Sequence, residues 1–112
     1  MLRVICGAFL VAIISNGAAL AESLGIYTHR QPFLLEPILE AYTKKTGVEF
    51  QTVYAPKGLA ARLKAEGERT EADLVLTVDI SRIKELADTG LLAPLASDIL
   101  NKHVPSYLRD AN

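Results

Sequence analysis

Cysteine is nearly absent from the sequence: the single one, Cys6, lies close to the N-terminus inside an apolar run. The rest of the chain therefore has no disulfide and no thiolate ligand, so any bound metal would be held by oxygen or imidazole groups. The chain also lacks a basic excess, with 12 Lys and Arg against 13 Asp and Glu. This balance argues against nucleic acid as a partner.

Apolar runs long enough to cross a membrane, which takes about 20 residues, are also missing. The run at residues 4–14 is shorter; it follows Arg3 and precedes Ala-Leu-Ala at residues 19–21. This arrangement is typical of a secretory signal peptide, so we expect cleavage near Ala21 and export of the product to the periplasm. An uncleaved anchor or a buried helix is the alternative. The lone cysteine lies too deep in the run to be a lipid-attachment site, which favours a free protein.

Strand and helix patterns alternate along the rest of the chain. Apolar and β-branched residues predict strands at 24–27, 48–54 and 72–78, of which the third is the most apolar and the expected central strand. Apolar residues at helical spacing, with their end signals, predict helices from Pro32 to Gly47, at 59–68, from Asp79 to Gly90, and at 98–103. The order β-α-β-α-β-α predicts an α/β fold with a parallel sheet and flanking helices.

Apolar stripes on two of these helices predict which faces pack against the sheet. The first stripe consists of Leu34, Leu35, Ile38, Leu39 and Tyr42, and the third helix carries Ile80, Ile83, Leu86 and Ala87. We expect Tyr27 and Tyr42 to be core residues. Pro37 falls about a turn after the start of the first helix, and we expect it to delay the regular helix.

Ligands of parallel sheets bind outside the carboxyl ends of the strands, where residues 28–32, 55–58 and 77–81 should meet. Arg30 is the strongest candidate there, because a guanidinium is permanently charged and can hold a carboxylate, carbonate or phosphate by two parallel hydrogen bonds. Gln31 adds an uncharged donor, and the helix start that follows favours anions. We predict a small-anion site at Arg30 and Gln31. The alternative is a surface arginine paired with a carboxylate such as Glu36.

Other polar residues near these strand ends carry weaker predictions. His29 can ligate a metal or sense pH, but a lone histidine is more often structural. Thr77 and Asp79 can hydrogen-bond a ligand or cap a helix. Pro-Lys-Gly at 56–58 can present a lysine and backbone N–H groups to an anion, without the glycine-rich pattern of a phosphate loop. We find no nucleophile–base pair or spaced carboxylate pair, so we predict a binding protein and not an enzyme.

Three segments together resemble a known family: YTHRQPFLLEPILEAYTKKTGVEF, APKGLAARLKAEGE and ADLVLTVDISRIKELADTGLLAPL. With the signal peptide, they are similar to the ferric-iron-binding periplasmic subunits of ABC importers, the group that includes the iron-deficiency-induced proteins. The resemblance covers residues 24–110. It implies a monomeric two-lobed protein that closes on Fe³⁺ and a carbonate-like anion and delivers the iron to a permease in the inner membrane. It also implies that Arg30 and Gln31 hold the anion, with His29, Thr77 and Asp79 as candidate supporting groups.

The sequence departs from the family pattern in its metal ligands and its length. Other members place a histidine in the first loop and a glutamate after the third strand, positions that Gln31 and Val78 occupy here. Members also continue far beyond residue 110, through a second lobe and the tyrosine pair that supplies the main iron ligands. We therefore expect residues 22–112 to be the N-terminal part of lobe one of a truncated protein, with no metal site of its own and weak or absent iron binding.

Two alternatives stay open. The same fold can serve another oxyanion or a polyamine instead of iron. The chain can also be a small exported interaction domain that binds no ligand. An exported hydrolase has the least support, because no catalytic arrangement is visible.

Overall fold

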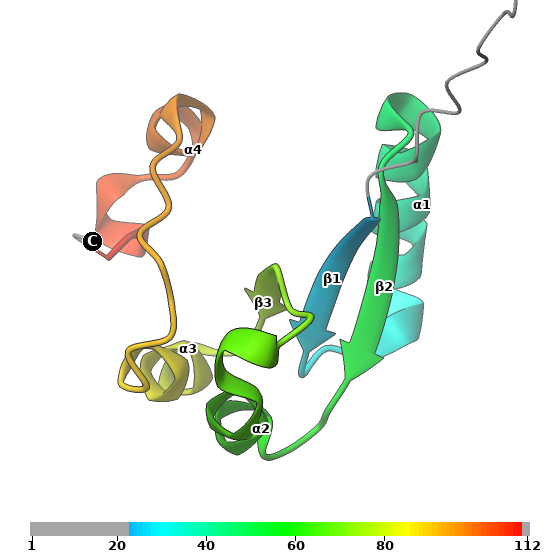
Figure 1. Cartoon of the computed structure of the whole chain (residues 1–112). Helices are drawn as coiled ribbons and strands as arrows, with labels where there is room; N and C mark the ends of the chain where they lie inside the picture. The colour runs from blue at the N-terminus through cyan, green and yellow to red at the C-terminus, as the bar shows by residue number, and fades with distance from the viewer. Residues whose placement is uncertain (1–22, 111–112) are drawn as a thin grey trace, which may run out of the picture.

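The computed structural model describes residues 23–110, which form a parallel sheet with helices on both faces (Figure 1). The strands are β1 (Ser23–Thr28), β2 (Glu49–Tyr54) and β3 (Leu74–Leu76). The α-helices are α1 (Pro32–Thr46), α2 (Leu59–Glu66), α3 (Ile80–Ala87) and α4 (Asp98–His103), with 3-10 turns at Gly67–Arg69 and Ser106–Leu108. The predicted signal peptide at residues 1–21 lies outside the described residues.

The sheet has the strand order β2-β1-β3, with both pairings parallel. β1 pairs with β2 along its whole length, from Ser23 opposite Glu49 to Thr28 opposite Tyr54. These observations confirm the predicted α/β fold. The prediction of a central third strand was wrong, because β1 is central and β3 has three residues and pairs on one side only. An apolar run of this kind indicates a strand but does not say how many neighbours the strand has.

Gly25 of β1 is the place where the chain before β3 crosses closest to the sheet. Its N–H donates to Asp73 Oδ2 at 2.8 Å, and its carbonyl oxygen accepts from the Asp73 N–H at 2.9 Å. A Cβ at this position would lie 1.8 Å from the carbonyl oxygen of Glu71. The position therefore requires glycine, since any side chain would push the two segments apart.

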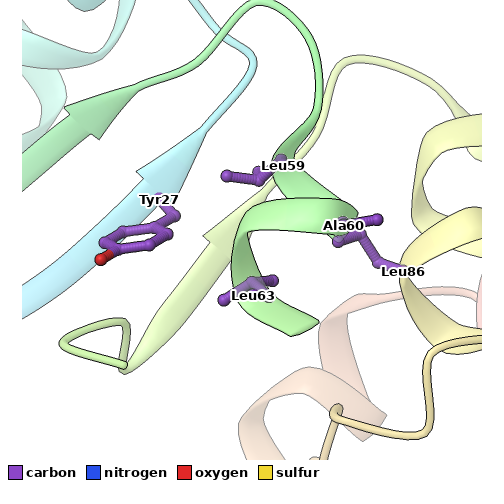
Figure 2. Close-up of a cluster of buried hydrophobic side chains, with 5 residues drawn as sticks. All are labelled: Tyr27, Leu59, Ala60, Leu63 and Leu86. Carbon is purple, nitrogen blue, oxygen red and sulfur yellow. The ribbon is translucent and has the colours of Figure 1, made fainter. Parts of the chain in front are cut away.

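The compact part of the core lies between the sheet, α2 and α3 (Figure 2). Its buried members come from three elements: Tyr27 from β1, Leu59, Ala60 and Leu63 from α2, and Leu86 from α3. Val53, Ala55, Ala72 and Val75 pack against this cluster. Tyr27 is thus a core residue, as predicted. Of the expected α3 stripe only Leu86 is buried, whereas Ile80 is 82% exposed.

The opposite face of the sheet carries α1, which packs mainly against β2. No residue of α1 is fully buried, and Tyr42, expected in the core, is half exposed, with its ring 5.9 Å from that of Phe50. A groove of about 420 Å³ runs between α1 and β2, lined by residues that include Leu35, Leu39 and Phe50. The apolar stripe of α1 is therefore only partly covered, by its contact with β2.

Most helix ends follow the sequence signals. Gly47 ends α1 in a left-handed conformation (φ 78°) and donates its N–H to Thr43 O at 2.8 Å, as predicted. Pro37 does not delay α1, which is helical from Pro32 onward, so this expectation was wrong. α2 ends at Glu66, two residues early, because Gly67 leaves the helical conformation. The prediction that the third helix continues to Gly90 was wrong, since α3 ends at Ala87 and the Thr89 and Gly90 N–H groups bond to carbonyl oxygens three residues back in a tighter turn.

α4 begins and ends where predicted, and the Ser97 side chain caps it by accepting the Leu100 N–H. Figure 1 shows α4 and the turn after it standing apart from the sheet, beyond an irregular stretch at residues 91–97. Several large apolar side chains of this segment are exposed, among them Leu95, Ile99 and Tyr107. No helix within residues 23–110 is long and apolar enough to cross a membrane.

Candidate functional site

The segments after the three strands meet at one edge of the sheet, which we call the rim (residues 28–32, 55–58 and 77–81). The Ala55 N–H donates to Thr28 O at 2.9 Å, and the His29 N–H donates to Leu76 O at 3.1 Å. Both bonds continue the parallel pairing past the strand ends. The predicted convergence of the three segments is therefore confirmed.

Arg30 stands at the rim, and among residues 23–110 it has no carboxylate partner. The ion pairs of residues 23–110 are Arg62–Glu66, Arg82–Asp79 and Lys84–Asp88. The predicted alternative, a pair between Arg30 and Glu36, is thus absent from the described residues. The backbone of Arg30 is fixed, because its N–H donates to the Oγ1 of the fully buried Thr28 at 2.8 Å. The result is an anchored backbone that carries a partly exposed, unneutralised guanidinium.

Two helices that begin at the rim have no side-chain cap. At α1 the capping position is the exposed Gln31, whose side chain makes no capping bond, and at α2 it is Gly58 in a left-handed conformation (φ 73°). Neither helix has an acidic residue in its first turn. Free N–H groups and the positive end of a helix dipole favour negative charge. The electrostatics around Arg30, Gln31 and the exposed Lys57 therefore suit an anion.

His29 is buried, with 7% of its surface exposed, and its Nδ1 has no hydrogen-bond partner among the described residues. The pKa of His29 is lowered, first by burial and then by the nearby Arg82 cation, against the opposing carboxylates of Glu85 and Asp79. His29 is therefore neutral at physiological pH. Residues 23–110 contain no group of three or more His, Cys, Asp or Glu side chains placed to hold a metal ion.

Asp79 takes the capping role that the sequence allowed. Its Oδ1 accepts the Arg82 N–H at 2.9 Å, and its Oδ2 lies 3.6 Å from Arg82 Nε. The Thr77 hydroxyl donates to Asp79 O at 3.3 Å. Thr77 and Asp79, two of the three candidate supporting groups, are thus engaged in shaping the turn between β3 and α3.

Sequence reasoning missed Arg82 as a rim residue. Its Nη1 donates to the carbonyl oxygen of Pro56 at 3.1 Å, which joins α3 to the segment between β2 and α2. Its place three residues after a helix cap was visible in the sequence. The direction in which its side chain reaches depends on how α3 packs, which no local pattern encodes.

A second polar cluster lies away from the rim, at the edge of the core. The Tyr27 hydroxyl donates to Glu66 Oε2 at 3.0 Å, and the Arg62 guanidinium lies over the Tyr27 ring at 4.7 Å. Arg62 Nε also donates to Glu66 Oε1 at 2.7 Å, and the Thr70 hydroxyl donates to Glu66 Oε2 at 2.8 Å. Because every charge here has a partner, the cluster fastens α2 to β1 and leaves no free group for a ligand.

Residues 31–108 match the family described as bacterial extracellular solute-binding protein. The chain is 30% identical to iron uptake protein A1 of Synechocystis sp., over 93% of the chain and 29% of that protein. It is 32% identical to the thiamine-binding periplasmic protein of Brucella suis biovar 1, over 91% of the chain and 32% of that protein. The chain therefore spans less than a third of the length of these relatives.

Solved structures show the same similarity in three dimensions. Ferric iron-binding protein A of Mannheimia haemolytica, in an open conformation, superimposes with a TM-score of 0.79 at 42% identity, over 82% of the chain and 29% of that protein. The Trichodesmium IdiA (FutA) protein, solved with iron and citrate ligands, gives 0.73 at 32% identity, over 80% of the chain and 28% of that protein. These matches confirm the resemblance to ferric-iron-binding proteins.

Proposed function

Because the chain belongs to the family of bacterial extracellular solute-binding proteins, we propose that it acts in ferric-iron uptake as a binding component of an ABC importer. Membership of this family confirms the prediction of a binding protein rather than an enzyme. The iron-related names of several relatives support iron as the solute. We further propose a monomer in the periplasm, exported by a signal peptide cleaved near Ala21, with a permease of the inner membrane as its partner.

The proposed contribution of the described residues is an anion subsite at Arg30 and Gln31. The observation that carries it is the Arg30 guanidinium, which has no carboxylate partner within residues 23–110 and stands beside the uncapped start of α1. A planar guanidinium can hold a carbonate or a carboxylate by two parallel hydrogen bonds. His29, Thr77 and Asp79 are the proposed supporting groups: the buried His29 joins the rim segments through its N–H bond to Leu76 O, and the other two fix the adjoining turn.

The proposed function leaves open which residues hold the iron itself. Fe³⁺ is a hard cation that oxygen donors suit best, and within residues 23–110 no three His, Cys, Asp or Glu side chains come together to hold a metal ion. We propose that the chain by itself binds iron weakly or not at all, while the anion subsite at Arg30 is present. A ferric titration that gave a tight, coloured, phenolate-type complex would contradict this.

Calorimetric titration with bicarbonate and with citrate tests the anion subsite. Replacing Arg30→Gln should weaken binding by about tenfold or more, because a charged hydrogen-bonding group is lost. Arg69→Gln is the matched control, since Arg69 is exposed and lies in the 3-10 turn after α2, outside the rim. Equal affinities for the wild type and Arg30→Gln would refute the subsite.

The Brucella relative raises one other candidate solute, thiamine. Thiamine is an organic cation, and the unpaired Arg30 guanidinium would repel it. The charge of the rim therefore favours an anion, and the same argument weighs against a polyamine. Competition of thiamine, spermidine and citrate for the chain would separate these solutes, because only citrate should bind in a manner that depends on Arg30.

A further inference from the structure

Arg82 connects the 55–58 segment to the start of α3, which no backbone hydrogen bond among the described residues does. Its Nη1 donates to Pro56 O at 3.1 Å, and its Nε lies 3.6 Å from Asp79 Oδ2. Within residues 23–110 this is the one side-chain hydrogen bond that ties the 55–58 segment to another part of the rim. The tied segment carries Lys57 and leads into the uncapped start of α2.

His29 takes no part in the anion contacts proposed above, but it adjoins the segment that carries this connection: its N–H donates to Leu76 O at 3.1 Å, three residues before the Asp79 that pairs with Arg82. It is more than nine-tenths buried, and its Nδ1 lacks a hydrogen-bond partner among the described residues. The charged groups that act on it all come from α3 or its cap: Arg82, Glu85 and Asp79. A neutral imidazole is compatible with the field of the Arg82 guanidinium, whereas an imidazolium is repelled by it.

We propose that Arg82 is a positioning residue for the rim anion subsite, and that protonation of His29 releases it from Pro56. This inference rests on the proposed anion-binding function and adds a pH dependence to it. At neutral pH, Arg82 holds the 55–58 segment, which the Ala55 N–H joins to Thr28 O at 2.9 Å, and so orders Lys57 and the uncapped start of α2 at the rim. When His29 gains a proton, that order is lost and the anion is bound less tightly.

The physical reason is competition for a limited number of carboxylates. An imidazolium at His29 repels the Arg82 guanidinium and attracts the carboxylates of Asp79 and Glu85. Asp79 already caps α3 and pairs with Arg82, so a new partner weakens the contact that orients Arg82. The result is a guanidinium that no longer reaches the Pro56 carbonyl.

The sign of the effect follows from the pKa of His29, which burial and Arg82 lower. The folded state favours the neutral imidazole, so the stability that this confers is complete above the pKa of about 6.5 of an unfolded histidine. It is lost as the pH falls below that value toward the lowered pKa of the folded state. Release should therefore occur on acidification, not at alkaline pH.

Sulfate titration at about pH 7.5 and about pH 5 tests the proposal, because the charge of sulfate does not change over this range, whereas acidification favours protonation of His29. We expect the wild-type affinity to fall by about fivefold or more at the lower pH, the low end of typical coupling between two sites. Protection of the 55–58 amides from hydrogen exchange, corrected for the intrinsic pH dependence, should fall in parallel. Equal affinity and equal protection at both pH values would overturn the proposal.

Three variants separate positioning from a general loss of structure. Arg82→Gln should show low protection of the 55–58 amides at both pH values, and Arg82→Lys should restore part of it at neutral pH. His29→Gln should abolish the pH dependence. His103→Gln is the matched control, because His103 is the other histidine of the sequence and is exposed on α4. A pH response that survived His29→Gln and disappeared in His103→Gln would assign the response to His103 and overturn the proposal.

The failure of this inference can be told apart from failure of the proposed function. If sulfate binding depends on Arg30 but not on pH, the anion subsite is supported and the proposed role of His29 is refuted. If sulfate does not bind at either pH, the anion subsite fails. The amide protection then still decides whether His29 controls the contact between Arg82 and Pro56.

Discussion

The two faces of the sheet differ in how completely they are covered. On the α2 face, Tyr27, Leu59, Leu63 and Leu86 are buried together, contributed by a strand and two helices (Figure 2). On the α1 face the fully buried side chains are Ile26 and Thr28 of the central strand, while Leu74 and Leu76 on β3 are 41% and 37% exposed. Parallel sheets normally have both faces covered by helices. The stability of the described residues must therefore come mainly from the α2 face.

The difference also explains where the rim gets its order. The 55–58 and 77–81 segments lead directly into α2 and α3, the two helices of the covered face. Arg30 and Gln31 lead into α1, which has no fully buried residue. The rim thus joins segments held by α2 and α3 to a segment held by the less buried α1. Mutations on the two faces should therefore change the free energy of unfolding by unequal amounts.

Truncating the covered face should have the largest effect. Leu86→Ala removes a fully buried side chain from α3, and we expect unfolding free energy to drop by about 2–5 kcal/mol, from lost transfer energy and a cavity. Ile80→Ala on the same helix is the control, because Ile80 is 82% exposed and its loss should cost about 0.5 kcal/mol or less. Urea unfolding measures both. Equal losses would mean that α3 does not pack as described.

Gly25→Ala should come next. The added Cβ would meet Glu71 O at 1.8 Å, so the chain before β3 must move away from β1. Such overpacking costs about 1–3 kcal/mol, and it should also expose the hydrogen bonds between Gly25 and Asp73. Gly90→Ala is a useful contrast, since the Gly90 Cβ would meet no atom and only its positive φ (72°) is strained. Faster hydrogen exchange at Asp73 in Gly25→Ala alone would confirm the close approach.

Tyr27→Phe tests the polar edge of the covered face, and we expect a smaller loss of unfolding free energy. The ring stays in the core, while the hydrogen bond from its hydroxyl to Glu66 is removed. The pKa of Glu66 is lowered chiefly by its hydrogen bond from Arg62, with Thr70 and Tyr27 adding to the effect, so the variant should raise that pKa toward its ordinary value. The stability from a lowered carboxyl pKa is present at neutral pH and is lost as the pH falls through that pKa.

The gap in stability between Tyr27→Phe and the wild type should therefore narrow in acid. Urea midpoints at neutral and acidic pH measure this gap, and an NMR titration follows the Glu66 carboxyl itself. A Glu66 pKa that did not move in the variant would show that the hydroxyl does not act on this carboxyl. Thr70→Val, which removes another donor to the same oxygen, is the matched comparison.

Local signals predicted the elements of the covered face, two of its buried residues (Tyr27 and Leu86) and the convergence of the rim, but not the buried residues of α2. Gly47 as the end of α1 and residues 98–103 as α4 were visible because each depends on its near neighbours in sequence. The meeting of the three rim segments followed from alternating strands and helices, since parallel strands place their carboxyl ends together. The candidate anion residues, Arg30 and Gln31, were selected from this topology and their chemistry.

The wrong predictions of burial share a physical cause: whether a residue is buried depends on what packs against it. The apolar run around β3 predicted a central strand, and the stripe with Tyr42 predicted a buried helix face, yet both are partly exposed. Apolar composition sets what a face prefers, and only tertiary packing decides whether it is covered. The reach of Arg82 to Pro56 escaped prediction for the same reason.

Ile38→Ser should have the smallest effect and completes the comparison of the two faces. Ile38 lies on α1 and is 66% exposed, so its side chain gives up little burial on truncation. We expect a loss of about 0.5 kcal/mol or less, as for most exposed positions, partly from the lower helix propensity of serine. Urea unfolding beside Leu86→Ala provides the measurement. A loss above about 1 kcal/mol would mean that the α1 face is covered in solution by contacts beyond those within residues 23–110.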